Sequence, residues 1–182
     1  MKKILYLLSF LLIISGCSLN TDIDNTPTKQ VEAYFNNYQT LSKEILNQLD
    51  LIVDSEKNFN EEQKIEYRNI LKKHYQDLVY EIKNETIDGD KATVEVEIEV
   101  NDYSKILKEA EIYKTTNETE FLDENKNFDN QKYNDYKLNL FKNNGEKVKY
   151  TLYISLSKIN NKWTLDDLTK TEEDKILGIY EY

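Results

Sequence analysis

The segment KATVEVEIEV, residues Lys91 to Val100, decides the fold of this chain, because its apolar and polar residues alternate without a break. Successive side chains of a β-strand point to opposite faces, so the alternation predicts a strand with one dry face and one wet face. That pattern is typical of an antiparallel sheet with only one face packed on a core. The segment therefore indicates a sheet that is covered on one side and exposed to water on the other.

Three further strands are expected around this segment. Tyr80–Ile87 precedes it, and Asp88-Gly89-Asp90 is a turn sequence that joins the two strands into a hairpin. Alternating residues from Val148 to Leu156 predict a third strand. Asn160-Asn161 then predicts a tight turn into a fourth strand, which contains Trp163 and Leu165. Two such hairpins predict a four-stranded antiparallel sheet.

Helical spacing precedes the first hairpin. Pro27 suits a first helical turn, and apolar residues then recur at steps of three and four from Thr28 to about Asp54, which predicts one long amphipathic helix. Asn60 followed by Gln63 resembles a capping box and predicts the start of a second helix. Two long N-terminal helices are therefore expected to cover the dry face of the sheet.

Helical spacing returns between the hairpins, over Tyr103–Phe121 and Asn130–Lys142. Thr171 with Asp174 predicts the cap of a short last helix, which Gly178 is expected to end. The expected fold class is α+β, with a four-stranded antiparallel sheet packed against long N-terminal helices.

This order of elements, over roughly residues 28–168, resembles the cystatin-like and nuclear transport factor 2-like folds, in which a curved sheet wraps a long N-terminal helix. The C-terminal stretch and the region from Tyr67 to Tyr80 are also similar to small lipoproteins of unknown function in Gram-positive bacteria. The likeness to small lipoproteins implies no activity. The fold likeness permits a cavity enzyme of the nuclear transport factor 2-like kind or an inhibitory protein of the cystatin-like kind, in each case only by analogy.

The N-terminus has the parts of a secretory signal. Lys2 and Lys3 precede an apolar run from Ile4 to Ile14, which is about half of the ~20 residues that a membrane-spanning helix needs. Ile14-Ser15-Gly16-Cys17 resembles the lipobox of bacterial lipoproteins, in which the cysteine thiol is diacylated and the chain is cut before it. The resemblance implies a signal peptide over residues 1–16, a lipidated tether over 17–27 and one domain over 28–182. It also implies a membrane anchor on Cys17 that holds the protein at the extracytoplasmic face.

Charge and cysteine content exclude several classes of function. The formal net charge is −10, and removal of residues 1–16, which carry two lysines and no acid, makes it −12. Nucleic acid demands basic surfaces, so it is not expected as a partner, and adhesion of the whole domain to an anionic membrane by charge is not expected either. Cys17 is the sole cysteine, so lipidation leaves no thiol for a disulfide, for catalysis or for a metal.

The wet face of the Lys91–Val100 strand carries the first candidate binding residues. Glu95, Glu97 and Glu99 would lie about 7 Å apart along it, and like charges so placed favour opposite lysines or a basic partner. Lys147 and Lys149 are the expected lysines if the two hairpins pair. Tyr153, on the polar face of its strand, is a further candidate for contact with a ligand, since a tyrosine ring stacks while its hydroxyl forms hydrogen bonds. A solvated sheet face is the simpler interpretation.

Two other patterns resemble, in part, a catalytic pair and a metal-binding loop. His74 is the only histidine, and Asp77 lies three residues later on the same predicted helix, so the two could form an acid–base pair. A histidine at the edge of an apolar stripe is more often a packing residue. Asp123, Asn125, Asn127 and Asp129 alternate as in a calcium loop, but Phe128 and Asn134 replace the glycine and the glutamate that such a loop needs, so no metal site is expected.

These observations predict a non-catalytic, lipid-anchored domain that binds a small ligand, a peptide or an envelope protein at the open face or the mouth of the sheet. No cofactor is expected. One alternative is an enzyme with a small cavity in which His74 works with a carboxylate. Another is a structural or inhibitory protein of the cell envelope.

Overall fold

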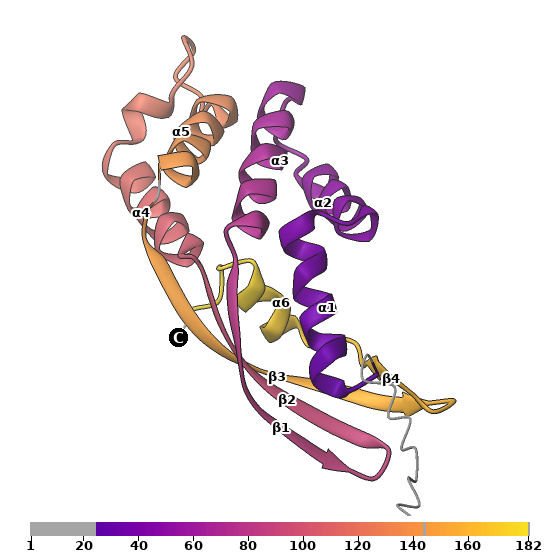
Figure 1. The fold of residues 1–182 in the computed structure, drawn as a ribbon. Helices are drawn as coiled ribbons and strands as arrows, with labels where there is room; N and C mark the ends of the chain where they lie inside the picture. The colour runs from indigo at the N-terminus through magenta and orange to yellow at the C-terminus, as the bar shows by residue number, and fades with distance from the viewer. Residues whose placement is uncertain (1–24, 144, 182) are drawn as a thin grey trace, which may run out of the picture.

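The fold is α+β, with one four-stranded antiparallel sheet in the order β1-β2-β3-β4. The computed structural model describes residues 25–143 and 145–181 (Figure 1), so the predictions for the signal peptide, Cys17 and the following seven residues lie outside the described part. The described elements are α1 (Pro27–Thr40), α2 (Lys43–Ser55), α3 (Glu61–Gln76), β1 (Val79–Asp88), β2 (Lys91–Asn101), α4 (Tyr103–Thr116), the 3-10 helix η1 (Glu118–Phe121), α5 (Asn130–Asn143), β3 (Lys147–Ile159), β4 (Lys162–Leu165) and α6 (Lys170–Ile176).

As the alternation of residues in β2 predicts, this strand has one buried apolar face and one polar face. Its apolar residues are all buried, and all but Val100 pair with buried residues of β3, as in Val96 with Leu152 and Ile98 with Tyr150. Both predicted hairpin turns are also present. Gly89 takes a positive φ of 59° in the first turn, and Asn160 and Asn161 take 51° and 66° in the second. Left-handed residues of this kind match the twist of paired strands, so the prediction of a four-stranded antiparallel sheet is confirmed.

The sheet is strongly curved, and the helices α1, α3 and α6 lie on its concave side (Figure 1). Val31 and Phe35 of α1 and Leu71 of α3 are fully buried in one core together with the apolar face of the sheet. The helices α4 and α5 gather at one end of the sheet, whereas the tips of both hairpins and the start of α1 lie at the other end. The molecule therefore has two distinct ends, joined by the long strands β2 and β3.

The prediction of one long helix from Thr28 to about Asp54 is wrong, because the chain breaks between α1 and α2. Leu41 takes a left-handed φ of 54°, and the backbone N–H of Ser42 donates to the carbonyl of Asn37 over 2.9 Å. The hydroxyl of Ser42 then caps α2 by accepting from the N–H of Ile45. Apolar spacing continues across this break because both helices bury one face in the same core, so periodicity alone could not reveal it.

The cap predicted for the last helix is also wrong, by two residues. Thr169, rather than Thr171, caps α6, and its backbone N–H donates to the Glu172 carboxylate over 2.7 Å. Asp174 instead lies 2.8 Å from the Lys170 ammonium. Glutamate is long enough to reach back to the cap, which explains why the pair Thr169 and Glu172 prevails. The capping box of Asn60 and Gln63 is confirmed.

Candidate functional site

A cleft of about 640 Å³ opens between α3 and α5, at the end of the sheet where β2 stops and β3 starts. Ile70, Tyr103 and Phe141 give it an apolar floor, and charged residues of α3 and α5 form its rim. Asn101 and Lys147, which pair with each other across the sheet, close it at the strand ends. The cleft thus lies at the mouth of the sheet, one of the two places that the sequence favours for a ligand.

Tyr103 is positioned by the C-terminal turn of the chain. Its backbone N–H and that of Ser104 both donate to the carbonyl of Gly178 over 2.8 Å, which fixes the start of α4 against the residues after α6. The Tyr103 ring meets the Phe141 ring edge to face at 4.7 Å. Burial raises the pKa of the Tyr103 hydroxyl to about 12, so this group stays protonated at neutral pH and keeps its hydrogen-bond donor.

Ion pairs hold the rim of the cleft. The Lys142 ammonium of α5 lies 3.1 Å from the Glu66 carboxylate of α3, and the Lys73 ammonium lies 3.7 Å from the Asp77 carboxylate. Their side chains remain largely exposed to water, and ion pairs of this kind contribute little net stability. A charged ligand group can therefore replace either partner without a large loss of stability.

His74 lies behind the cleft floor and not on its surface. The imidazole is 1% exposed, and it stacks on the ring of Tyr103 at 4.7 Å. Its Nε2–H donates to the carbonyl of Ile176 over 2.8 Å, and its Nδ1 lies 3.3 Å from the amide nitrogen of Asn101. Asp77 forms neither of these hydrogen bonds, so the hypothetical acid–base pair is not assembled in this structure.

The predicted acidic row lies on the convex outer face of the sheet. Lys149 sits opposite Glu99, as expected, and its ammonium lies 3.0 Å from Glu97. The hydrogen bond from Lys149 lowers the pKa of the Glu97 carboxyl, which therefore stays ionised. Lys147 instead pairs with Asn101 and reaches the cleft.

Tyr153 lies beside Glu95 on the same outer face and is 59% exposed. It is therefore free to stack on a partner, as its place on the polar face of its strand suggests. Farther along the same face, Lys149 of β3 pairs with Glu97 and Glu99 of β2, which agrees with a solvated face. Contact of Tyr153, Glu95, Glu97 or Glu99 with a ligand stays a prediction.

The loop between η1 and α5 is held by its own backbone. One carboxylate oxygen of Asp123 accepts hydrogen bonds from the N–H groups of Asn125 and Asn127, both over 2.8 Å. These bonds lower the pKa of the Asp123 carboxyl, with the Asn127 bond as the main cause. No group of three or more His, Cys, Asp or Glu side chains suited to a metal ion occurs within residues 25–143 and 145–181.

Sequence reasoning did not identify the residues that line the cleft, because its floor is assembled from distant segments. Ile70, Tyr103 and Phe141 each belong to an apolar stripe of a different helix, where they are indistinguishable from core residues. The one usable signal was the run of lysines and acids beside those stripes, such as Glu66 and Lys142. That signal says nothing about which helices face each other.

Comparison with known proteins adds one finding at the N-terminus. Residues 1–18 match the family model of the prokaryotic membrane lipoprotein lipid attachment site, and this match contains the predicted lipobox with Cys17. No curated protein and no solved structure matches the chain. Among the described residues, no helix is both long and apolar enough to cross a membrane. The chain therefore carries a prokaryotic lipoprotein lipid attachment site ahead of its α+β domain, and this site supports covalent anchoring to a membrane by lipid.

Proposed function

We propose that this lipoprotein is a non-catalytic binding protein of the extracytoplasmic membrane face, and that its ligand occupies the cleft between α3 and α5. The observation that carries the proposal is the cleft itself, about 640 Å³ with an aromatic floor and an ion-paired rim. Sites for small molecules are concave, mostly apolar and supplied with a few polar groups, and they commonly measure roughly 300–1,000 Å³. The cleft is concave and falls within this range of volumes, and its lining is mixed, with an apolar floor beneath a rim of polar and charged side chains.

The lining of the cleft indicates an amphipathic ligand with charges of both signs. An apolar part would pack on Tyr103 and Phe141, and the Tyr103 hydroxyl offers a hydrogen bond at the floor. Ligand carboxylates would compete with Glu66 for Lys142, and ligand amines would compete with Lys142 for Glu66. A short peptide or a small zwitterionic molecule fits this description best.

A binding role is favoured over catalysis by the chemistry of the lining. Lys73 and Lys142 are held in ion pairs, and both ring nitrogens of His74 are occupied by groups of the fold. The acid–base alternative would require His74 to leave these partners and to reach the cleft. A structural or inhibitory role stays as an alternative. The curved sheet around α1, which resembles the cystatin-like arrangement, supports it, but no residue can be assigned to such a role.

The test compares two tryptophan substitutions at exposed asparagines of helices. Asn69→Trp places a large ring at the wall of the cleft, whereas Asn37→Trp adds the same ring on α1, away from the cleft. Short peptides and zwitterionic metabolites are screened for a thermal shift with the lipidated protein in nanodiscs. We expect any ligand that stabilises the wild type to stabilise Asn37→Trp equally and Asn69→Trp much less. Equal stabilisation of both variants would place the ligand elsewhere and refute the proposed site.

A further inference from the structure

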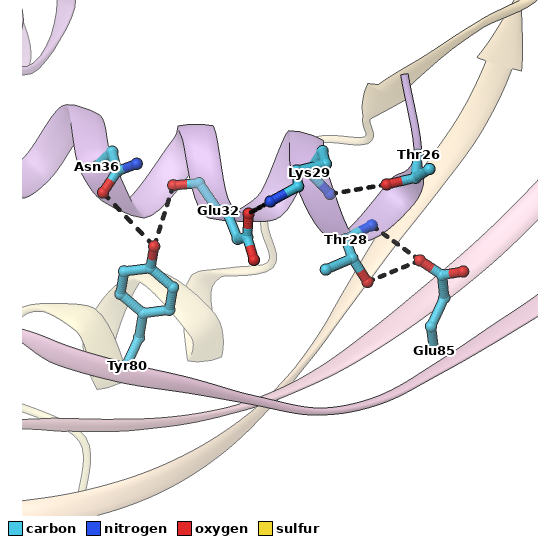
Figure 2. A network of polar contacts seen from close by, with 7 residues as sticks. All are labelled: Thr26, Thr28, Lys29, Glu32, Asn36, Tyr80 and Glu85. Carbon is cyan, nitrogen blue, oxygen red and sulfur yellow. Dashed lines mark hydrogen bonds and ion pairs between the residues drawn. The ribbon is translucent and has the colours of Figure 1, made fainter. Parts of the chain in front are cut away.

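The described chain begins at the hairpin end of the sheet and is fastened there. The side-chain amide of Asn25 donates to the carbonyl of Asn161 over 2.8 Å, and its oxygen accepts from the N–H of Trp163 over 3.0 Å. The backbone N–H and hydroxyl of Thr28 both donate to the Glu85 carboxylate, over 2.9 and 2.7 Å, as Figure 2 shows. Asn25, the first described residue, therefore lies beside the β3–β4 turn.

The β3–β4 tip is basic, although the processed chain as a whole is strongly acidic. Lys158 and Lys162 flank the turn, and no acidic residue occurs from Lys158 to Leu165. Ile159, between these lysines, is 56% exposed. The neighbouring β1–β2 tip lies alongside, since the N–H of Lys158 donates to the carbonyl of Asp90 over 2.8 Å, and it carries the half-exposed Ile87.

Chain length keeps this tip close to the bilayer. Eight peptide units separate Cys17 from Asn25, so the lipidated residue lies at most about 29 Å from the fastened one. The 13 residues of β3 measure about 40 Å along the strand, so the other end of the sheet lies much farther from the fastened residue than the tip does. A tether this short gives the tip a high effective concentration at the lipid surface, so a weak contact is enough.

We propose that the β3–β4 tip, residues Lys158–Lys162, docks on the surface of the bilayer that holds the lipid on Cys17. Ile159 enters the interfacial region, and Lys158 and Lys162 lie at the level of anionic headgroups, as lysines with apolar stems do. Asp88 and Asp90 of the neighbouring turn repel the same headgroups, which confines the contact to this tip. The inference depends on the lipid anchor but not on the ligand proposed for the cleft.

The test uses two isoleucines of equal exposure. Ile159→Cys and Ile112→Cys each replace a residue that is 56% exposed, the first at the tip and the second on α4. Lipidation consumes Cys17, so each lipidated variant has one free thiol for an environment-sensitive fluorophore. The labelled proteins are placed on vesicles of phosphatidylethanolamine and phosphatidylglycerol, with and without brominated acyl chains.

We expect a blue-shifted emission and a loss of intensity with brominated lipid for Ile159→Cys only. Adding Lys158→Glu and Lys162→Glu to that variant should abolish both effects, while flotation with the vesicles is retained. Equal signals from the two labels would overturn the inference. So would a tip signal that disappears when the protein is diluted on the vesicle, because a second copy would then be the partner. Loss of flotation in the parent variants would refute the anchor itself, whatever occupies the cleft.

Discussion

Protonation of His74 should weaken the fold as the pH falls from about 6.5 toward 4, so the effect begins above the range in which most carboxylates titrate. In the native state Nε2–H donates to the Ile176 carbonyl, so the neutral ring can only accept at Nδ1, where the amide of Asn101 lies 3.3 Å away. A second proton would face that amide donor inside the core. Burial is the main cause that lowers the pKa of His74 to about 4, and the charge of Lys147 acts in the same direction.

The sign of the effect follows from the two states. The unfolded chain binds a proton at the ordinary histidine pKa of about 6.5, whereas the folded chain resists it down to about 4. The contribution of neutral His74 to the free energy of unfolding is therefore complete above about pH 6.5, and it is lost as the pH falls toward 4. One pKa unit corresponds to about 1.4 kcal/mol, so the loss between about pH 7.5 and pH 5 is about 2 kcal/mol, and its limit is about 3 kcal/mol.

Urea denaturation at several pH values measures this loss, with His74→Gln as the control. Glutamine cannot titrate, so the variant should lose about 2 kcal/mol less than the wild type over the same interval. Because the chain has one histidine, its imidazole resonances also report the native pKa directly by NMR in an untagged protein. A native pKa near 6.5, together with equal pH dependence of the two proteins, would refute the reasoning.

Two further substitutions test the packing and the outer face. Gly178 has a φ of +70°, and a Cβ there would overlap the carbonyl oxygen of Asn101. Gly178→Ala should therefore lower the free energy of unfolding by about 3 kcal/mol or more, as measured by urea denaturation. A loss below about 1 kcal/mol would contradict this close approach of the two backbones. Glu97→Gln should leave the urea midpoint unchanged, because the carboxylate and its partner Lys149 are solvated; a clear drop would show that the outer face is covered.

The sheet could be predicted because its signals are local. Alternation over Lys91–Val100 and the turn residues Gly89 and Asn160-Asn161 each act within a few residues, and each appears in the structure as expected. The capping box of Asn60 and Gln63 is local in the same sense. Such features are governed by backbone conformations that neighbouring side chains select, so one sequence is enough to identify them.

The helix break and the cleft could not be predicted because they depend on tertiary contacts. Leu41 adopts a left-handed conformation that few side chains favour, and the two helices that flank it both bury residues in one core. Tyr103 and Phe141 meet at 4.7 Å, although about 40 residues separate them along the chain. The periodicity within α4 or α5 does not distinguish an apolar residue in the cleft floor from one in the core.

The distribution of charge and the place where the start of the described chain is fastened favour the same orientation of the domain. A processed net charge of −12 repels the body of the domain from an anionic surface, whereas the acid-free tip from Lys158 to Leu165 is attracted to it. β3 begins at Lys147 in the cleft and ends at Ile159 in the tip, so the two lie at opposite ends of a strand that is about 40 Å long along its curved path. A domain held by its tip therefore presents the cleft away from the membrane, where a ligand can arrive without crossing the headgroup layer.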